Sequence, residues 1–161
     1  MGRGESKVDK AGSGGTNIVP KAVASQVDRF GREHANDKVE YGESVDMRGN
    51  VTYKSKGVRG EVTVPTRAGE IKVHNHTTGR TFSAQDLNSV ALNSSKGVVA
   101  TTKNGAFYFI KGDNFQDIKF ASRVMSDTFQ IQFNFAEESK RIQWLKDNQA
   151  KYGYKFAFVK R

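Results

Sequence analysis

Cysteine is absent from the 161 residues of this sequence, and proline and tryptophan are scarce, with two residues and one residue respectively. Without cysteine the chain forms neither a disulfide framework nor a thiolate metal site, so histidine and carboxylate side chains would have to hold any zinc. There is no run of about 18 apolar residues, which a membrane-spanning helix needs, and no hydrophobic signal peptide at the N-terminus. These absences predict a cytoplasmic protein with no membrane partner.

The charge of the chain is strongly positive, because 26 lysine and arginine residues outnumber 17 acidic residues and give a formal net charge of +9. Such an excess is compatible with nucleic-acid binding, with an acidic protein partner, or with solubility alone. The basic residues are scattered and form no dense block. The sequence therefore predicts at most weak, non-specific nucleic-acid binding.

The chain is long enough for one domain with a sizeable core. Glycine-rich residues 1–17 have little to bury and predict a flexible N-terminal arm, which leaves 18–161 as a single domain. Helical and alternating apolar patterns both occur, so the expected fold class is α/β (α+β), with a mixed central β-sheet flanked by helices.

Apolar periodicity and turn residues predict the order of the elements along the chain. They indicate a helix within 19–35, a hairpin over 38–53, a strand over 71–76, a helix of about a dozen residues that starts at Ser83 and is stopped by Gly97, a strand pair over 98–102 and 106–110, a helix over 137–150 and a closing strand over 154–159.

Two segments have ambiguous patterns. Val62–Val64 is a short strand candidate, and 129–135 alternates like a strand inside a region, 115–151, that is otherwise helical in pattern. Alternating aromatic residues suit either a hydrophobic core or a base-stacking surface, and core packing is the commoner use. We therefore expect a core role for Phe129, Phe133, Phe135, Phe156 and Phe158.

Two of the three histidines occur together in the sequence His74-Asn75-His76. In a strand, residues i and i+2 face the same side, so both imidazoles can reach one metal ion while Asn75 faces away. Asp86 is the nearest following carboxylate, and two histidines with one carboxylate form an open catalytic zinc site. The alternative is a polar strand end followed by a helix cap, because Ser83 to Asp86 also has the spacing of a capping box.

The string from His74 to Leu87, HNHTTGRTFSAQDL, resembles the signature of the JAMM/MPN metalloprotease family, which is His-x-His, a short loop and Ser-x-x-Asp. The likeness is greatest to the version in phage proteins and bacterial polymorphic toxins, with RadC-like proteins nearby, and it covers about residues 36–112. One departure is Thr77, which stands where the family usually has proline. Losing proline loosens the loop but removes no ligand.

The resemblance implies a JAMM/MPN, cytidine-deaminase-like architecture and a zinc cofactor held by His74, His76 and Asp86. It also implies that Ser83 stabilises the oxyanion of the tetrahedral intermediate. The implied reaction is hydrolysis of an amide or isopeptide bond in a protein or peptide substrate by a zinc-bound water.

The family also needs an upstream glutamate as general base, and Glu40 fits best because its Glu-x-Gly context resembles the family pattern. Glu43 is the alternative, three residues later and on the opposite strand face. Two other functions remain open at this point. Thr77 favours a JAMM-like binding module that has lost catalysis, and the positive charge favours a RadC-like, nucleic-acid-associated protein. The phage and toxin likeness further suggests a chain that is phage-encoded or delivered within a larger protein.

Overall fold

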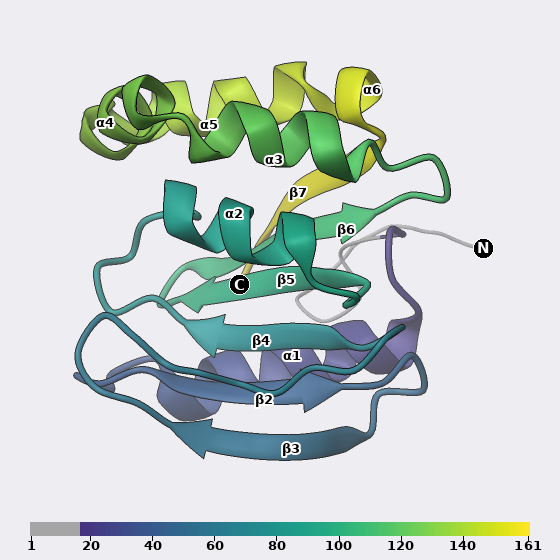
Figure 1. The fold of residues 1–161 in the computed structure, drawn as a ribbon. Helices are drawn as coiled ribbons and strands as arrows, with labels where there is room; N and C mark the ends of the chain where they lie inside the picture. Colours follow the sequence, from purple (N-terminus) through teal and green to yellow (C-terminus); the bar gives the residue numbers. More distant parts are fainter. Residues whose placement is uncertain (1–16) are drawn as a thin grey trace.

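A six-stranded mixed β-sheet forms the centre of the computed structural model, which describes residues 17–161 (Figure 1). Helices cover both faces of the sheet, which confirms the predicted mixed sheet flanked by helices. The expected flexible arm over 1–17 lies outside the described residues except for residue 17. In the described part of the chain, no helix is both long and apolar enough to cross a membrane.

The strands lie in the order β3-β2-β4-β5-β6-β7, and every neighbouring pair is antiparallel except β4 and β5, which are parallel. A parallel pair needs a crossover connection, and α2 (Ala84–Leu92) supplies it between β4 and β5. The strand bounds are β2 (Tyr41–Val45), β3 (Val51–Lys56), β4 (Ile71–Asn75), β5 (Gly97–Thr102), β6 (Gly105–Lys111) and β7 (Tyr154–Lys160).

The sheet separates two hydrophobic cores. On one face α1 (Lys21–His34) packs against strand residues that include Ile71, Val73 and Val99. On the other face lie α2 and four further helices, α3 (Asp117–Met125), α4 (Asp127–Phe135), α5 (Glu138–Asp147) and α6 (Gln149–Tyr152) (Figure 1). Because Ile71 and Val73 face α1, the alternation along β4 directs His74 to the face that carries α2.

Helix α2 is shorter than predicted. It ends at Leu92, and Asn93 is already extended, with φ −90° and ψ 170°, whereas Gly97 begins β5 rather than stopping the helix. The side chain of Asn93 accepts hydrogen bonds from both the backbone N–H and the hydroxyl of Ser95. Such a local side-chain turn competes with helical hydrogen bonding and accounts for the early end.

The segment over Val62–Val64 forms no strand, although its apolar residues alternate. Val62 and Val64 are buried while Thr63 is exposed. They fill the space left by Gly42 on β2, where an added Cβ would lie 2.2 Å from Val64 Cγ2. The alternation therefore reflects packing of an extended segment on the sheet, without ladder hydrogen bonds.

The aromatic segment over 129–135 is the helix α4, so its strand-like alternation was misleading. Phe129 and Phe133 are one helical turn apart, stack with ring centroids 5.0 Å apart, and contact Trp144 of α5. They are buried as expected, as is Phe156, but Phe135 is 86% exposed and Phe158 is 40% exposed. The core prediction is therefore wrong for these last two residues.

Candidate metal centre

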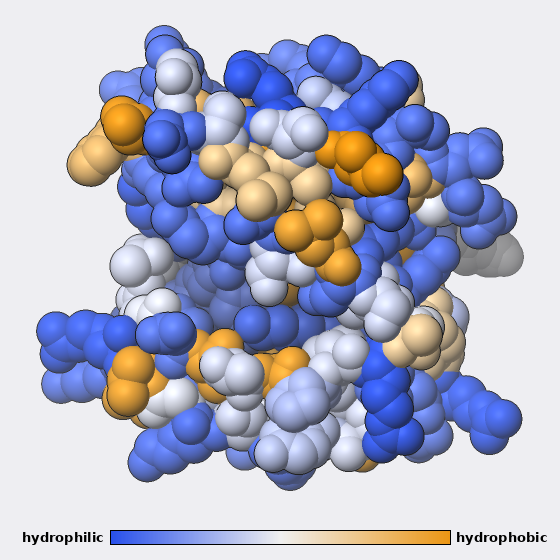
Figure 2. All heavy atoms as spheres, in the orientation of Figure 1, coloured by the Kyte–Doolittle hydropathy of each residue, from blue (hydrophilic) through white to orange (hydrophobic). Residues whose placement is uncertain are grey.

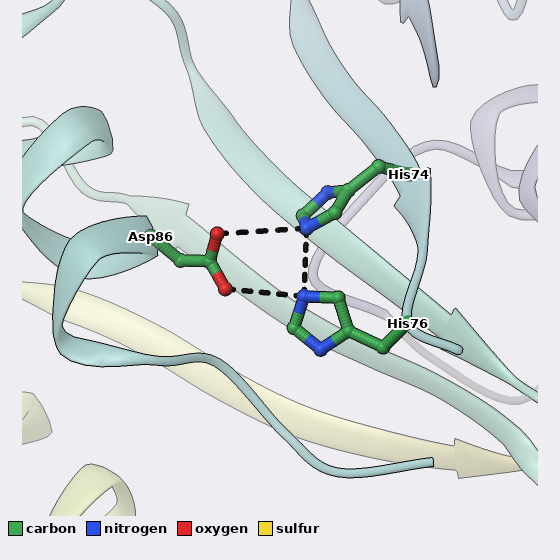
Figure 3. A group of neighbouring side chains, drawn as sticks. All are labelled: His74, His76 and Asp86. Atoms are coloured by element: carbon green, nitrogen blue, oxygen red, sulfur yellow. Dashed lines mark hydrogen bonds and ion pairs between the residues drawn. The ribbon is translucent and has the colours of Figure 1, made fainter. Parts of the chain in front are cut away.

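The end of β4 and the start of α2 bring His74, His76 and Asp86 together (Figure 3). The Nε2 atoms of the two histidines are 2.8 Å apart. Asp86 Oδ1 lies 3.6 Å from Nε2 of His74, and Asp86 Oδ2 lies 3.1 Å from Nε2 of His76. Two nitrogens and a carboxylate, each from a different side chain, thus converge on one point.

These separations suit a tetrahedral zinc ion. With zinc–ligand bonds of about 2.0–2.1 Å, tetrahedral geometry places neighbouring donor atoms about 3.3 Å from one another. The three observed distances, 2.8, 3.1 and 3.6 Å, bracket that value. The donor set is also the type found in open catalytic zinc sites, with one position left for water or substrate.

Helix capping fixes the position of Asp86. Ser83 is the N-cap of α2, its Oγ accepts a hydrogen bond from the Asp86 backbone N–H at 3.1 Å, and Asp86 Oδ2 accepts one from the Ser83 N–H at 3.0 Å. The complete capping box leaves Asp86 Oδ1 facing His74. The capping and ligand interpretations of this aspartate are therefore compatible, because one carboxylate serves both.

The two histidines are oriented differently. The ring nitrogen Nδ1 of His76 lies 2.8 Å from the Arg80 carbonyl. The backbone N–H of His76 donates to the Thr101 carbonyl at 2.8 Å. A backbone carbonyl on Nδ1 keeps the proton there and leaves Nε2 free for a metal. Nδ1 of His74 is buried and has no hydrogen-bond partner among the described residues.

The loop between His76 and Ser83 is held by side chains of α5 and by a glycine. Arg141 donates to the carbonyls of Thr81 and Phe82, and Glu138 accepts from the Thr81 N–H at 2.7 Å. Gly79 adopts a left-handed φ of 77°, which most other residues avoid. These contacts fix the loop.

Electrostatics couple the three candidate ligands. Burial lowers the pKa of His74 to about 4, although Asp86 opposes the shift. Burial acts in the same direction on His76, but there the hydrogen bond and charge of Asp86 prevail and raise the pKa. Burial disfavours the charged form of Asp86, yet the two histidines hold its pKa well below the usual range. Asp86 is therefore a carboxylate, the form that binds a metal.

Glu40 lies just before β2, on the same side as the candidate ligands. Its N–H donates to the Val58 carbonyl, and its own carbonyl accepts from Gly57. The side chain is buried beside His76 and Asp86, and burial, reinforced by the Asp86 charge, raises its pKa. A buried carboxyl with a raised pKa next to a metal site is a suitable general base.

Glu43 lies on the opposite face, as its spacing from Glu40 predicts. Its side chain is buried under α1, where Oε1 accepts a hydrogen bond from the Gln26 amide at 2.9 Å. Burial raises the pKa of Glu43, and the Gln26 hydrogen bond opposes this. The sheet thus separates the two candidate glutamates.

A cleft of about 670 Å³ opens from the metal centre to solvent. The polar side of α2 forms one wall and the segment over 60–66 forms the other. Figure 2 shows the same face of the molecule hollowed between the helices and the strands, with hydrophilic residues in the hollow. Its floor carries Glu40, Lys72 and His74, and Ser83 and Asp86 lie at the α2 side.

Comparisons of the chain with protein-family models, with curated proteins and with solved structures find no match. No relative therefore supplies a role for any residue, and the chemistry follows from the geometry of the site itself.

Several residues around the site were assigned no functional role from the sequence. Lys72 lines the cleft because it is two residues before His74, so the same period-two rule that paired the histidines places it there. Arg141 and Glu138 support the loop from a distant helix. Nothing local in the sequence signals that long-range contact.

Proposed function

We propose that this protein is a zinc-dependent peptidase or isopeptidase of the JAMM/MPN type, which hydrolyses an amide or isopeptide bond. One observation carries the proposal: three ligand atoms within 4.8 Å of one another lie at an open cleft beside a separate buried carboxyl, Glu40. The mixed sheet with helices on both faces is compatible with a JAMM/MPN architecture.

His74, His76 and Asp86 would hold the zinc, whose chemistry is to polarise a carbonyl and to lower the pKa of a water molecule toward neutrality. Glu40 would accept a proton from the attacking water and return it to the leaving amine. Its raised pKa brings it closer to neutral pH, where proton transfer in both directions is efficient.

Ser83 is placed to donate a hydrogen bond to the substrate. Its Oγ accepts from the Asp86 N–H, which leaves the hydroxyl hydrogen free, and the side chain lines the cleft. The start of α2 adds the partial positive charge of a helix N-terminus. Both effects stabilise negative charge that develops on a carbonyl oxygen.

The direct test is hydrolysis of linear and isopeptide-linked peptides by zinc-loaded protein, followed by mass spectrometry. We expect cleavage that a chelator stops and added zinc restores. Cleavage that persists in the presence of the chelator would show that the metal takes no part in the reaction.

One observation favours a second candidate function, a JAMM-like binding module without turnover. Among the described residues, Nδ1 of His74 has no partner for the supporting hydrogen bond that usually orients a metal-bound histidine. Stoichiometric zinc without cleavage of any peptide would favour this module.

Replacing Ser83 by alanine tests its two roles separately. Loss of the N-cap is expected to lower the free energy of unfolding by about 1 kcal/mol. Loss of the hydroxyl donor is expected to lower kcat by about 10²–10³-fold in addition. Both are measured on one preparation, by denaturant unfolding and by turnover.

Ser126→Ala is the matched control for this substitution. Ser126 is the N-cap of α4, where its side chain accepts from the Phe129 N–H at 3.1 Å, and it does not line the cleft. It should lose similar stability and keep full turnover. If the two variants lose turnover equally, Ser83 contributes only a helix cap.

The affinity for zinc should fall as the pH is lowered, with one proton displaced for each zinc ion that binds. Zinc needs neutral imidazoles, and the pKa of His76 is raised above 6.5 whereas that of His74 is about 4. Between about pH 5 and pH 6.5, zinc must therefore displace one proton, from His76, and the affinity falls about tenfold per pH unit. Competition with a zinc-binding dye across this range measures the slope. Displacement of two protons for each zinc ion would mean that both histidines are charged in the metal-free protein.

A further inference from the structure

Lys72 is the one lysine or arginine among the residues that line the cleft at the metal centre. It lies on β4 two residues before His74, so both side chains leave the same face of the sheet. The side chain is partly buried, and Nζ donates a hydrogen bond to the Val62 carbonyl at 3.2 Å. No carboxylate of the described residues forms an ion pair with it, but its charge acts at longer range on Glu40, where it opposes the rise of the Glu40 pKa.

The strand register places Lys72 and Glu40 on opposite sides of His74. On β2, Gly42 is the partner of His74 and Ser44 is the partner of Lys72, whereas Glu40 lies two residues beyond Gly42 in the other direction. One strand repeat of two residues spans about 6.6–6.8 Å. The backbone of Lys72 therefore lies one strand repeat from that of His74, on the side away from Glu40.

The walls of the cleft near Lys72 are largely uncharged. The α2 wall presents Gln85 and Ser89, and Asn93 follows directly after the helix. On the facing segment Glu61 is the acidic residue, and it is exposed. A substrate carboxylate that enters the cleft thus meets one lysine, which leaves the same face of the sheet as His74. Charge-assisted hydrogen bonds of this kind are about twice as strong as neutral ones.

We infer that Lys72 sets the specificity of the cleft, by binding a carboxylate of the peptide substrate near the scissile amide. This inference rests on the proposed peptidase function. The carboxylate belongs either to an aspartate or glutamate side chain or to the free C-terminus of the peptide. Lys72 acts in recognition and takes no part in the bond-breaking step.

A purely structural role for Lys72 makes a different prediction. Its hydrogen bond to Val62 ties the segment over 60–66 to the sheet, so its loss alone would lower stability and slow the cleavage of all peptides equally. Charge recognition instead changes the ratio between acidic and neutral peptides. The ratio of their kcat/KM values is therefore the informative measurement.

The experiment compares three peptide series of equal length with zinc-loaded protein: neutral with an amidated C-terminus, amidated with one internal glutamate at successive positions, and neutral with a free C-terminus. We expect one carboxylate-bearing series to be cleaved about tenfold to a hundredfold faster than the neutral series. The preferred series identifies the source of the carboxylate. Equal rates for all three would overturn the inference.

Variants at position 72 assign that preference to the lysine. Lys72→Arg should keep it, Lys72→Met should abolish it, and Lys72→Glu should reverse it toward peptides with a lysine at the same position. Lys155→Glu is the control, because Lys155 is an exposed strand residue outside the cleft. An unchanged acidic preference in folded Lys72→Glu would show that another group recognises the carboxylate.

A binding measurement separates failure of this inference from failure of the proposed function. Fluorescence anisotropy with labelled acidic and neutral peptides and metal-free protein needs no turnover. Absence of cleavage, together with an acidic preference in binding that Lys72→Glu abolishes, would overturn the peptidase and keep the recognition site. Equal binding of acidic and neutral peptides would overturn the recognition site.

Discussion

Glu40→Gln is expected to reduce turnover by about 10²–10⁴-fold, the usual loss when general acid–base help is removed. The amide keeps the size of the side chain but accepts no proton from water. Zinc content should not change, because Glu40 is not one of the three side chains whose donor atoms converge. Turnover of a cleaved peptide and metal analysis of the same sample provide the two measurements.

Glu43→Gln is the matched control, since it makes the same chemical change on the other face of the sheet. Its amide oxygen can still accept the hydrogen bond from Gln26, so folding and turnover should be nearly normal. If Glu43→Gln is the inactive variant, the general base has been assigned to the wrong glutamate. If both variants turn over normally, the proposed proton transfer does not operate.

His76→Ala and Asp86→Asn should each abolish stoichiometric zinc binding. The first removes a nitrogen ligand and the second removes the charged carboxylate ligand, from a site with three protein ligands among the described residues. We expect about one zinc per chain in the unaltered protein and close to none in either variant, measured by elemental analysis after purification without chelator. Asparagine at position 86 retains an oxygen that can accept from the Ser83 N–H. The helix cap is thus largely preserved, and metal loss is not confused with unfolding.

His34→Ala is the control for removal of a histidine. His34 closes α1, where its ring stacks on Tyr41 and Nδ1 lies 2.6 Å from Asp37 Oδ2, and it is not one of the converging ligands. This variant should keep its full zinc content. Full zinc occupancy in both His76→Ala and Asp86→Asn would instead show that the zinc binds elsewhere.

The parts of the site that were predictable from sequence are the ones set by local rules. Period-two alternation predicts that His74 and His76 face the same side, and the structure brings them together although His76 lies one residue beyond the end of β4. The Ser-x-x-Asp spacing predicts the capping box that the structure contains. The separation of Glu40 from Glu43 across the sheet follows from the same alternation. Each of these depends on residues only a few positions apart.

The parts that were missed depend on contacts between distant segments. Alternating apolar residues over 129–135 fit a strand, but helix α4 buries Phe129 and Phe133 and leaves Ile131 and Phe135 exposed. Periodicity cannot separate these cases, because residues i and i+4 share a face in both structures. Support of the site loop by Arg141 likewise arises only when α5 packs beside it.

Asp86 gives the N-terminus of α2 and the candidate metal centre a common side chain. Natural selection for a stable fold alone would therefore preserve Ser83 and Asp86 in a descendant that had abandoned metal binding. His74 has no comparable second role, because its buried Nδ1 finds no partner among the described residues, whereas His76 Nδ1 also contacts the Arg80 carbonyl. In an evolutionary series of such proteins, loss of the proposed activity would be recorded first at His74, while the serine and aspartate persisted.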